Sequence, residues 1–311
     1  MTTLVVILRP VQKPYPNPDP NDKKGLLLAA ISAVGIGLSM TVSRYAYDDG
    51  ANGLGVSTAR AVVFVPVVYF YCWISGRTIG LPARDWVHVL GLGLLMGAAY
   101  YGHLGAIEFI PVGLAAILFF TFPPIIGLIQ FVVFGEPPGL FKSLALIVSF
   151  GGLALMLGVS MGAANPLGIA MALGAAVCVA CNTVWTARRL AHVDGVVAVL
   201  HMALVAACAL VIACLVTGQA VLPRSPIGWA GVIGVIALQS ACLPLYYLAL
   251  PRIGALKTGM VGNLQPVISI LAAYILFTEV LSVSQLMGGG LVLGGIALMQ
   301  LADRFVKRNQ T

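Results

Sequence analysis

The chain has 311 residues, of which 60% are hydrophobic and only 9% are charged. A soluble globular domain carries about 25% charged residues, so this composition excludes a surface that faces water everywhere and indicates a protein embedded in lipid. The formal net charge of +7 does not indicate nucleic-acid binding, because the basic residues are scattered over loops and form no patch.

Residues 1–24 form a segment unlike the rest of the chain. Prolines crowd the second half of this segment, so we expect a proline-rich, non-helical tail. The apolar run at residues 4–8 is shorter than the roughly 7–15 residues of a signal-peptide core, and no basic region precedes it. The tail is therefore expected to stay with the protein, on the cytoplasmic side.

Ten apolar segments follow, each near the roughly 20 residues that a helix needs to cross a bilayer. In chain order they are residues 25–45, 54–75, 86–107, 111–134, 140–160, 166–187, 195–217, 227–250, 254–277 and 282–302. Very short links join the third span to the fourth and the eighth to the ninth, which predicts antiparallel neighbours. The sequence thus predicts an all-α integral membrane protein with ten transmembrane helices and a basic tail at 304–311.

Lys and Arg residues indicate how these spans are oriented. With the N-terminus in the cytoplasm, only Arg44, Arg60 and Arg224 fall on the outer side, which leaves 14 of the 17 basic residues on the inner side. This excess follows the positive-inside rule. We therefore expect a multi-pass protein of the cell inner (cytoplasmic) membrane with both termini in the cytoplasm.

The chain repeats itself at a spacing of 143 residues. The run Gly-Gly-Leu-Ala-Leu-Met at 151–156 returns as Gly-Gly-Ile-Ala-Leu-Met at 294–299, and Glu136 returns as Glu279 at the same spacing (279 − 136 = 143). Internal repeats in a membrane protein point first to a transporter, because two related halves can move about a site between them.

The repeats divide the spans five and five. We expect a first five-helix repeat at 25–160 and a second at 166–303. Five is an odd number, so the second repeat enters the membrane from the opposite side. The sequence therefore predicts two inverted repeats around a site near the middle of the bilayer.

The fourth and ninth spans carry prolines near their middle, Pro123 and Pro124 in one and Pro266 in the other. Proline lacks a backbone N–H and clashes with the carbonyl four residues earlier. A carbonyl freed at membrane depth needs a partner from protein or water. We predict two kinked helices that line a pathway and act as hinges, with a passive kink as the alternative.

Polar and aromatic side chains deep in the spans are candidates for a substrate cavity, because a buried polar group in lipid is costly without a partner. They are Ser39, Ser43, Arg60, Tyr100, Tyr101, His103, Phe119, Phe120, Asn182, Trp185, Gln239, Tyr246, Lys257, Asn263 and Gln265. Three alternatives stay open: the amides join helices, Tyr246 belongs to an interfacial belt, and Arg60 and Lys257 snorkel to headgroups.

The spans carry no Asp or Glu near their middle, so a carboxylate relay for protons is not visible. His103, with Glu108 nearby, is the remaining titratable candidate; we favour facilitated transport or exchange and keep proton coupling open. The cysteines, including the pair Cys178 and Cys181, are interpreted as packing residues. We expect no metal site, no cofactor and no catalytic residues.

Together these features resemble the drug/metabolite transporter superfamily, and within it the EamA-like transporters. The resemblance is carried by Phe-Gly-Glu at 134–136 and Phe-Thr-Glu at 277–279 after proline-bearing helices, and by Arg60 ahead of an apolar second span. It implies a central cavity formed by spans 1–4 and 6–9, with spans 5 and 10 at the periphery. It also implies export or exchange of small organic solutes. Thr278 departs from the pattern, in which glycine is common.

We therefore predict an exporter or exchanger of small organic metabolites, with amino acids or related amphipathic compounds as candidates, that works by alternating access. Its partners would be a small-molecule substrate and membrane lipid, without nucleic acid, and it would be a monomer or homodimer. A lipid-modifying membrane enzyme and a non-transporting scaffold are the alternatives. An enzyme would need a nucleophile–base or metal constellation, which the scattered residues His88, His192 and His201 do not supply.

Overall fold

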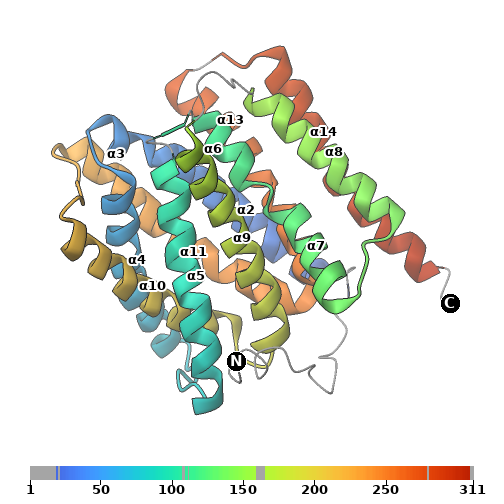
Figure 1. Cartoon of the computed structure of the whole chain (residues 1–311), viewed down its shortest axis with the longest axis horizontal. Helices are drawn as coiled ribbons and strands as arrows, with labels where there is room; N and C mark the ends of the chain where they lie inside the picture. The colour runs from blue at the N-terminus through green and yellow to red at the C-terminus, as the bar shows by residue number, and fades with distance from the viewer. Residues whose placement is uncertain are drawn as a thin grey trace.

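The computed structural model describes residues 19, 22–106, 109–110, 112–158, 165–278 and 280–308, without the side chains of 112–113 and 303–308. Every regular element in these ranges is a helix (Figure 1). The expectations for Glu108, Glu279 and most of the N-terminal tail lie outside the described residues.

Within the described residues, ten helical segments are long and apolar enough to cross a membrane, which confirms the predicted number. The first five spans are α2 (Lys23–Val42) with α3 (Arg44–Asp48), α4 (Gly53–Ile74), α5 (Trp86–Gly105) after the 3-10 turn η1 (Ala83–Asp85), α6 (Val112–Phe119) with α7 (Phe122–Phe134), and α8 (Leu140–Leu157). The second five are α9 (Pro166–Arg189), α10 (Gly195–Thr217), α11 (Pro226–Ile253), α12 (Ala255–Gly262) with α13 (Leu264–Phe277), and α14 (Val283–Arg308). The helix α14 continues into the segment expected as a basic tail, as far as Arg308.

Local sequence signals set where the sixth, seventh and eighth spans begin. The side chains of Asn165, Asp194 and Ser225 each accept a hydrogen bond from a backbone N–H in the first turn of the following helix. Such caps satisfy amides that have no partner within the helix. Pro166 and Pro226 come next in α9 and α11, where the missing N–H is not needed.

The two halves contain the same succession of helices and break at the same place. The helix α6 ends at Phe119, and α12 ends at Gly262, 143 residues later. The fourth and ninth spans also end alike, because Gly135 (φ 67°) and Thr278 (φ 52°) both adopt the left-handed conformation. With five spans in each half, the second half crosses the membrane in the opposite sense, and the fold is a pair of inverted five-helix repeats.

The fifth and tenth spans, α8 and α14, pack along each other at one side of the bundle (right in Figure 1). Glycines bring their backbones together: a Cβ added at Gly152 would lie 2.6 Å from the carbonyl oxygen of Gly288. Small residues at a helix contact are typical of membrane proteins, where close backbone approach replaces the hydrophobic driving force. This pair forms a peripheral support beside the other eight spans.

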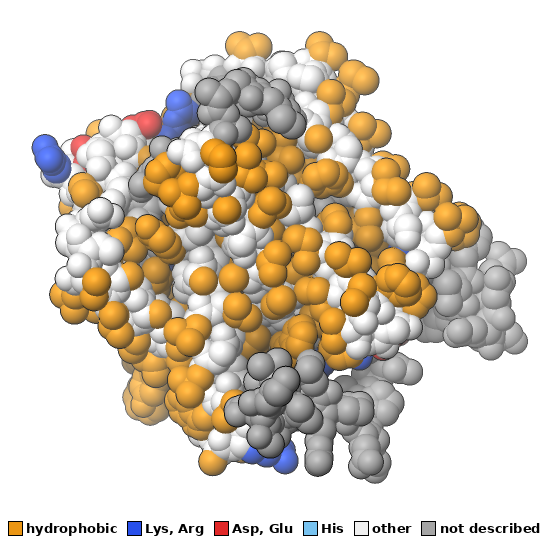
Figure 2. Space-filling model, in the orientation of Figure 1, with side chains coloured by type: hydrophobic (Ala, Val, Ile, Leu, Met, Phe, Trp, Pro, Cys, Tyr) orange, Lys and Arg blue, Asp and Glu red, His pale blue; other side chains and the backbone are white. Residues whose placement is uncertain are grey.

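The surface is that of a protein in lipid. Hydrophobic side chains cover the middle of the face in Figure 2, and charged side chains appear near its edges. Leu215, Val216 and Ile275 are 80%, 80% and 72% exposed. Apolar exposure on this scale is compatible with hydrocarbon as the solvent and not with water.

Candidate functional site

A cavity of about 690 Å³ lies between the two repeats. Its volume falls within the roughly 300–1,000 Å³ range of small-molecule sites. Spans 1–4, 6, 8 and 9 supply its walls, with Leu157 of α8 at the edge. The predicted residues that line it are Ser39, Ser43, Arg60, Tyr100, His103, Phe119, Phe120, Asn182, Gln239, Tyr246, Gln265 and Pro266.

The cavity opens at the end of the bundle where α3 and α13 finish. Arg44 and Asp48 line it there, with side chains 48% and 65% exposed, and form an ion pair within α3. The Arg44 guanidinium also lies 4.7 Å from the ring centroid of Phe277. The charge pattern of the loops predicts that this end is the outer one.

Hydrogen bonds between the sixth, eighth and third spans form the floor of the cavity. The Tyr247 hydroxyl donates to Asn182 Oδ1 (2.8 Å), and Asn182 Nδ2 donates to the carbonyl oxygen of Leu92 (2.8 Å). The hydroxyls of Thr183 and Tyr246 are 3.0 Å apart. Tyr246 is only 9% exposed, so it is a floor residue, and the alternative that it belongs to an interfacial belt is wrong.

The other two cavity amides differ in what they contact. Gln239 Nε2 donates to Ser39 Oγ (3.0 Å) and thereby joins α11 to α2. Gln265 lines the cavity from the start of α13, and its amide forms no hydrogen bond with any described residue. Of the three cavity amides, Asn182 and Gln239 bind helices together, and Gln265 has hydrogen-bonding capacity left for a solute.

Arg60 and His103 line the outer half of the cavity. The Arg60 guanidinium lies 3.8 Å from the ring centroid of Tyr100, and the His103 ring lies 3.9 Å from that of Phe119. Arg60 Nε and His103 Nδ1 are buried and have no hydrogen-bond partner among the described residues. Arg60 therefore faces the cavity, and the alternative that it snorkels to headgroups is wrong.

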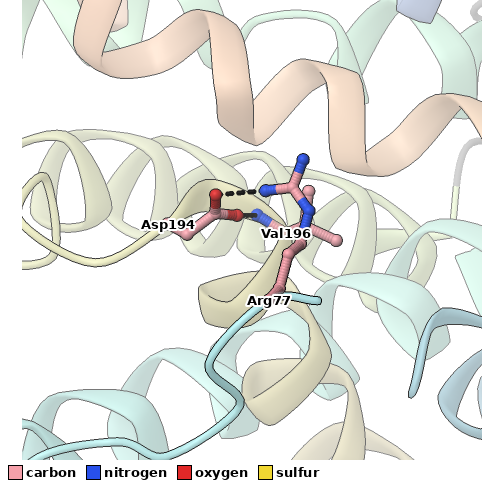
Figure 3. A network of polar contacts seen from close by, with 3 residues as sticks. All are labelled: Arg77, Asp194 and Val196. Atoms are coloured by element: carbon pink, nitrogen blue, oxygen red, sulfur yellow. Dashed lines mark hydrogen bonds and ion pairs between the residues drawn. The ribbon is translucent and has the colours of Figure 1, made fainter. Parts of the chain in front are cut away.

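An ion pair joins the two repeats at the opposite end of the bundle (Figure 3). Arg77, in the loop after α4, contacts one carboxylate oxygen of Asp194, while the other oxygen accepts the backbone N–H of Val196 (2.8 Å). Asp194 thus caps α10 and pairs with the other repeat at once. Just beneath the floor, Leu190 and Val196 are 1% exposed within an apolar cluster that closes the space.

Two further ion pairs join the halves at this same end, Arg188 with Glu136 and Arg252 with Asp22 (3.0 Å). A hydrogen bond between His192 Nε2 and Asp85 Oδ2 (2.8 Å) joins them as well. The hydrogen bond from Arg252 holds the pKa of Asp22 below its usual value of 3.8. Among the described residues, these ion pairs bridge the halves at the closed end, and the ion pair of Arg44 with Asp48 at the open end lies within one helix.

The loops at the open end are tied by a carboxylate. Asp49, after α3, accepts the backbone N–H groups of Ser225 and Arg224, each at 2.6 Å. These hydrogen bonds hold the pKa of Asp49 below its usual value of 3.8, since they favour the ionised form. The contact fixes the start of α11 against the α3–α4 turn beside the cavity mouth.

Four predicted cavity residues lie outside the cavity. Tyr101 is 41% exposed, because consecutive helical residues point about 100° apart and its neighbour Tyr100 takes the inward position. Trp185 packs against Phe134, with ring centroids 5.9 Å apart. These two aromatics contribute to packing or to the surface rather than to the cavity wall.

The other two belong to the ninth span. Asn263 sits at the break between α12 and α13, and its Nδ2 donates to Ser149 Oγ of α8 (3.0 Å). It joins helices, as one of the alternatives for the amides predicted. Lys257 is 5% exposed in α12 and does not line the cavity. Its burial also excludes the interpretation that it snorkels to headgroups.

The prolines of the fourth span act differently from the prediction. Pro123 and Pro124 occupy the first turn of α7, where their missing N–H groups leave no gap in the hydrogen bonds of that helix. The span is interrupted at Phe120 and Thr121 rather than kinked within a continuous helix. Pro266 lies in the first turn of α13, after the matching interruption. A hinge at these interruptions stays a prediction.

Further polar residues complete the cavity wall. Thr183 and Tyr247 belong to its floor, and Thr41 joins Ser269 of α13 across its side, with hydroxyl oxygens 3.0 Å apart. Of these residues, sequence reasoning did not single out Ser269. Hydroxyls are common in membrane helices, where they serve packing as often as function, so the sequence carried no signal that set Ser269 apart.

Comparisons with known proteins give a consistent picture. Residues 23–158 and again residues 166–301 match the family model of the EamA-like transporter family. A search of curated proteins gives no match. A solved structure titled "Crystal structure of protein" superposes with a TM-score of 0.75 at 19% identity, covering 89% of this chain and 99% of that one. At that identity the likeness is one of fold.

Proposed function

From the premise that this chain belongs to the EamA-like transporter family, we propose that it carries small amphipathic organic solutes across the membrane by alternating access. A multi-pass membrane transporter of this family requires a site that each side of the membrane reaches in turn. The cavity between the repeats has the position of such a site.

The observation that carries the proposal is the unequal closure of the two ends. The cavity is open beside Arg44 and Asp48, and ion pairs such as Arg77–Asp194 close the opposite end by joining the two repeats. Inverted repeats can exchange these arrangements by rocking against each other. The structure thus has the form of one of two states that such a cycle needs.

The chemistry of the wall supports a solute with both apolar and polar parts. Phe119, Phe120 and Tyr100 offer aromatic surface, and Gln265 offers an amide without a partner among described residues. Amino acids with apolar side chains and related metabolites fit this mixture. We propose export or exchange, in a cell inner membrane, with both termini cytoplasmic and the open end outside.

The coupling mechanism follows from the charges on the wall. Among the described residues that line the cavity, Asp48 at the mouth is the sole carboxylate, and it is paired with Arg44. A proton-carrying carboxylate inside the site is therefore lacking from the described wall, which favours exchange or facilitated transport. His103 is the group through which protons would otherwise be coupled.

The test is solute flux into proteoliposomes, screened over amino acids and related metabolites with and without solute inside. Gln265→Ala should weaken uptake at unchanged membrane abundance. Asn263→Ala, matched in chemistry, should lower thermal stability and leave the apparent affinity for solute unchanged, because its amide bonds to Ser149. Flux no greater than that of protein-free liposomes across the panel would refute the proposed function.

A further inference from the structure

The described residues that line the cavity carry an excess of positive charge. They include two guanidinium groups, Arg44 and Arg60, and one carboxylate, Asp48. Arg44 and Asp48 form an ion pair at the mouth, 3.5 Å apart and largely exposed. Arg60 is left as the one unneutralised fixed charge among these lining residues.

Arg60 lies about two turns into α4, a helix that is long and apolar enough to cross a membrane. Its guanidinium stacks on Tyr100 and forms no ion pair or hydrogen bond with any described residue. The buried Nε has no acceptor. Stacking on a ring satisfies the face of a guanidinium and leaves its N–H edge available.

An unpaired charge inside a membrane protein is costly and marks a functional position. Structural guanidinium groups at this depth are normally paired with a carboxylate or backbone carbonyl. Other arginines of this protein have carboxylate partners, for example Arg77, which pairs with Asp194. None of the described residues supplies an acceptor for Arg60, which leaves its N–H edge for water or for the solute.

The surroundings of Arg60 define the rest of the ligand. His103 lies within electrostatic reach of Arg60, and its ring packs on Phe119, which in turn contacts Phe120 and Phe122. An anion at Arg60 would thus have aromatic surface beside it. For an ammonium group, Asp48 is the carboxylate that the described wall offers. Because Asp48 is already paired with Arg44, it attracts a second cation weakly.

We propose that the solute is a monocarboxylate with an apolar body, whose carboxylate binds the N–H edge of Arg60 and whose body lies against the aromatic side chains around His103. A guanidinium binds a carboxylate through parallel charge-assisted hydrogen bonds, and one cation balances one carboxylate. The inference rests on the proposed function, because it assigns a substrate class to the same cavity.

Three matched probes test the charge preference: 3-phenylpropanoate, its neutral amide 3-phenylpropanamide, and the cation 3-phenylpropylamine. Binding to the purified full-length protein is measured by thermal shift and titration calorimetry, and flux is measured in proteoliposomes. The acid should bind at least about tenfold more tightly than the amide and the amine, given the usual strength of charge-assisted hydrogen bonds. Equal affinity of the wild type for acid and amide would overturn the proposal without any variant.

Arg60→Gln should weaken binding of the acid at least about tenfold and leave binding of the amide unchanged, and Arg60→Lys should recover part of the loss because it keeps the charge without the fork. Arg224→Gln is the matched control, since Arg224 lies on an exposed loop at the same end, outside the cavity. It should change neither affinity. An equal loss for Arg60→Gln and Arg224→Gln would mean that only the general field of the surface attracts the acid, which refutes the site.

The two levels of the proposal fail in different ways. Acid binding that depends on Arg60, with no flux of any solute, would refute transport and leave the anion site standing. Flux of acid, amide and amine at equal rates, unaffected by Arg60→Gln, would refute the anion site and leave transport standing.

Discussion

The ion pair between Arg77 and Asp194 should hold the protein in its outward-open state. The pair exists only while the ends of α4 and α10 are together, so its loss weakens the closed inner end. The side chains are 25% and 39% exposed, which places the pair among partly exposed ion pairs whose value is about 0.5–1 kcal/mol after solvent screening. Since 1.4 kcal/mol is a factor of ten, the inward-open population should rise about two- to fivefold.

Two substitutions isolate the ion pair from the helix cap. Asp194→Asn removes the charge but keeps a good N-cap for Val196, and Arg77→Gln removes the partner. Asp194→Ala also loses the cap, which costs about 1 kcal/mol more in stability. In a double-mutant cycle the two charge-removing changes should not be additive, because each breaks the same contact.

The assay uses a residue already in place. Cys72 is fully buried near the end of α4, five residues before Arg77. With the other cysteines replaced, a membrane-impermeant maleimide applied from the cytoplasmic side should alkylate Cys72 about two to five times faster in either variant. Unchanged alkylation in both variants, or effects that simply add in the double variant, would refute the inner-end lock.

Three further predictions concern the scaffold and its loops. Thr278→Gly should raise the free energy of unfolding in detergent by about 1 kcal/mol, because a β-branched residue at φ 52° is strained. Gly135→Ala, at the equivalent position of the first repeat, should lower it by a similar amount. A lower stability of Thr278→Gly would contradict the argument. Gly152→Ala should cost about 1–3 kcal/mol in thermal unfolding, since its new Cβ would meet backbone atoms of α14, whereas Gly151→Ala faces open space and should be neutral. The lowered pKa of Asp49 means that its contribution to stability is present above its usual value of 3.8 and is lost as the pH falls through its lower folded value. The melting temperature of Asp49→Asn should therefore approach that of the wild type below about pH 4, and a constant difference from pH 7 to 3 would exclude the clamp.

The spans and their repeat could be read from the sequence because lipid imposes a simple length rule. The matching ends of the fourth and ninth spans were visible as Glu136 and Glu279, and the departure at Thr278 marked a backbone position that favours glycine. These features follow from local composition and from the constant spacing of the two repeats, and predicting them does not require knowing how the helices pack.

The facing of individual polar residues could not be read in the same way. In most soluble helices the polar face shows which side points away from the core. Here nearly every helix face is apolar, so the sequence could not decide whether Tyr100 or Tyr101 faces the cavity. Asn263 and Gln265 likewise lie two residues apart, and only the packing of α8 against the break separates the helix contact of one from the cavity position of the other. The ion pairs at the closed end join distant loops, which sequence spacing does not bring together.

The ion pairs at the closed end lie where water reaches them, as the side-chain exposures of Arg77 and Asp194 show. Mobile ions shorten the range of such forces to about 10 Å at 0.1 M and about 3 Å at 1 M, whereas the aromatic and amide contacts deeper in the cavity are shielded from them. On the proposed orientation and transport cycle, the balance between the two states of the carrier would depend on the ionic strength of the cytoplasm. A cell that loses water concentrates its salts, and the same change would ease this protein towards its inward-facing form.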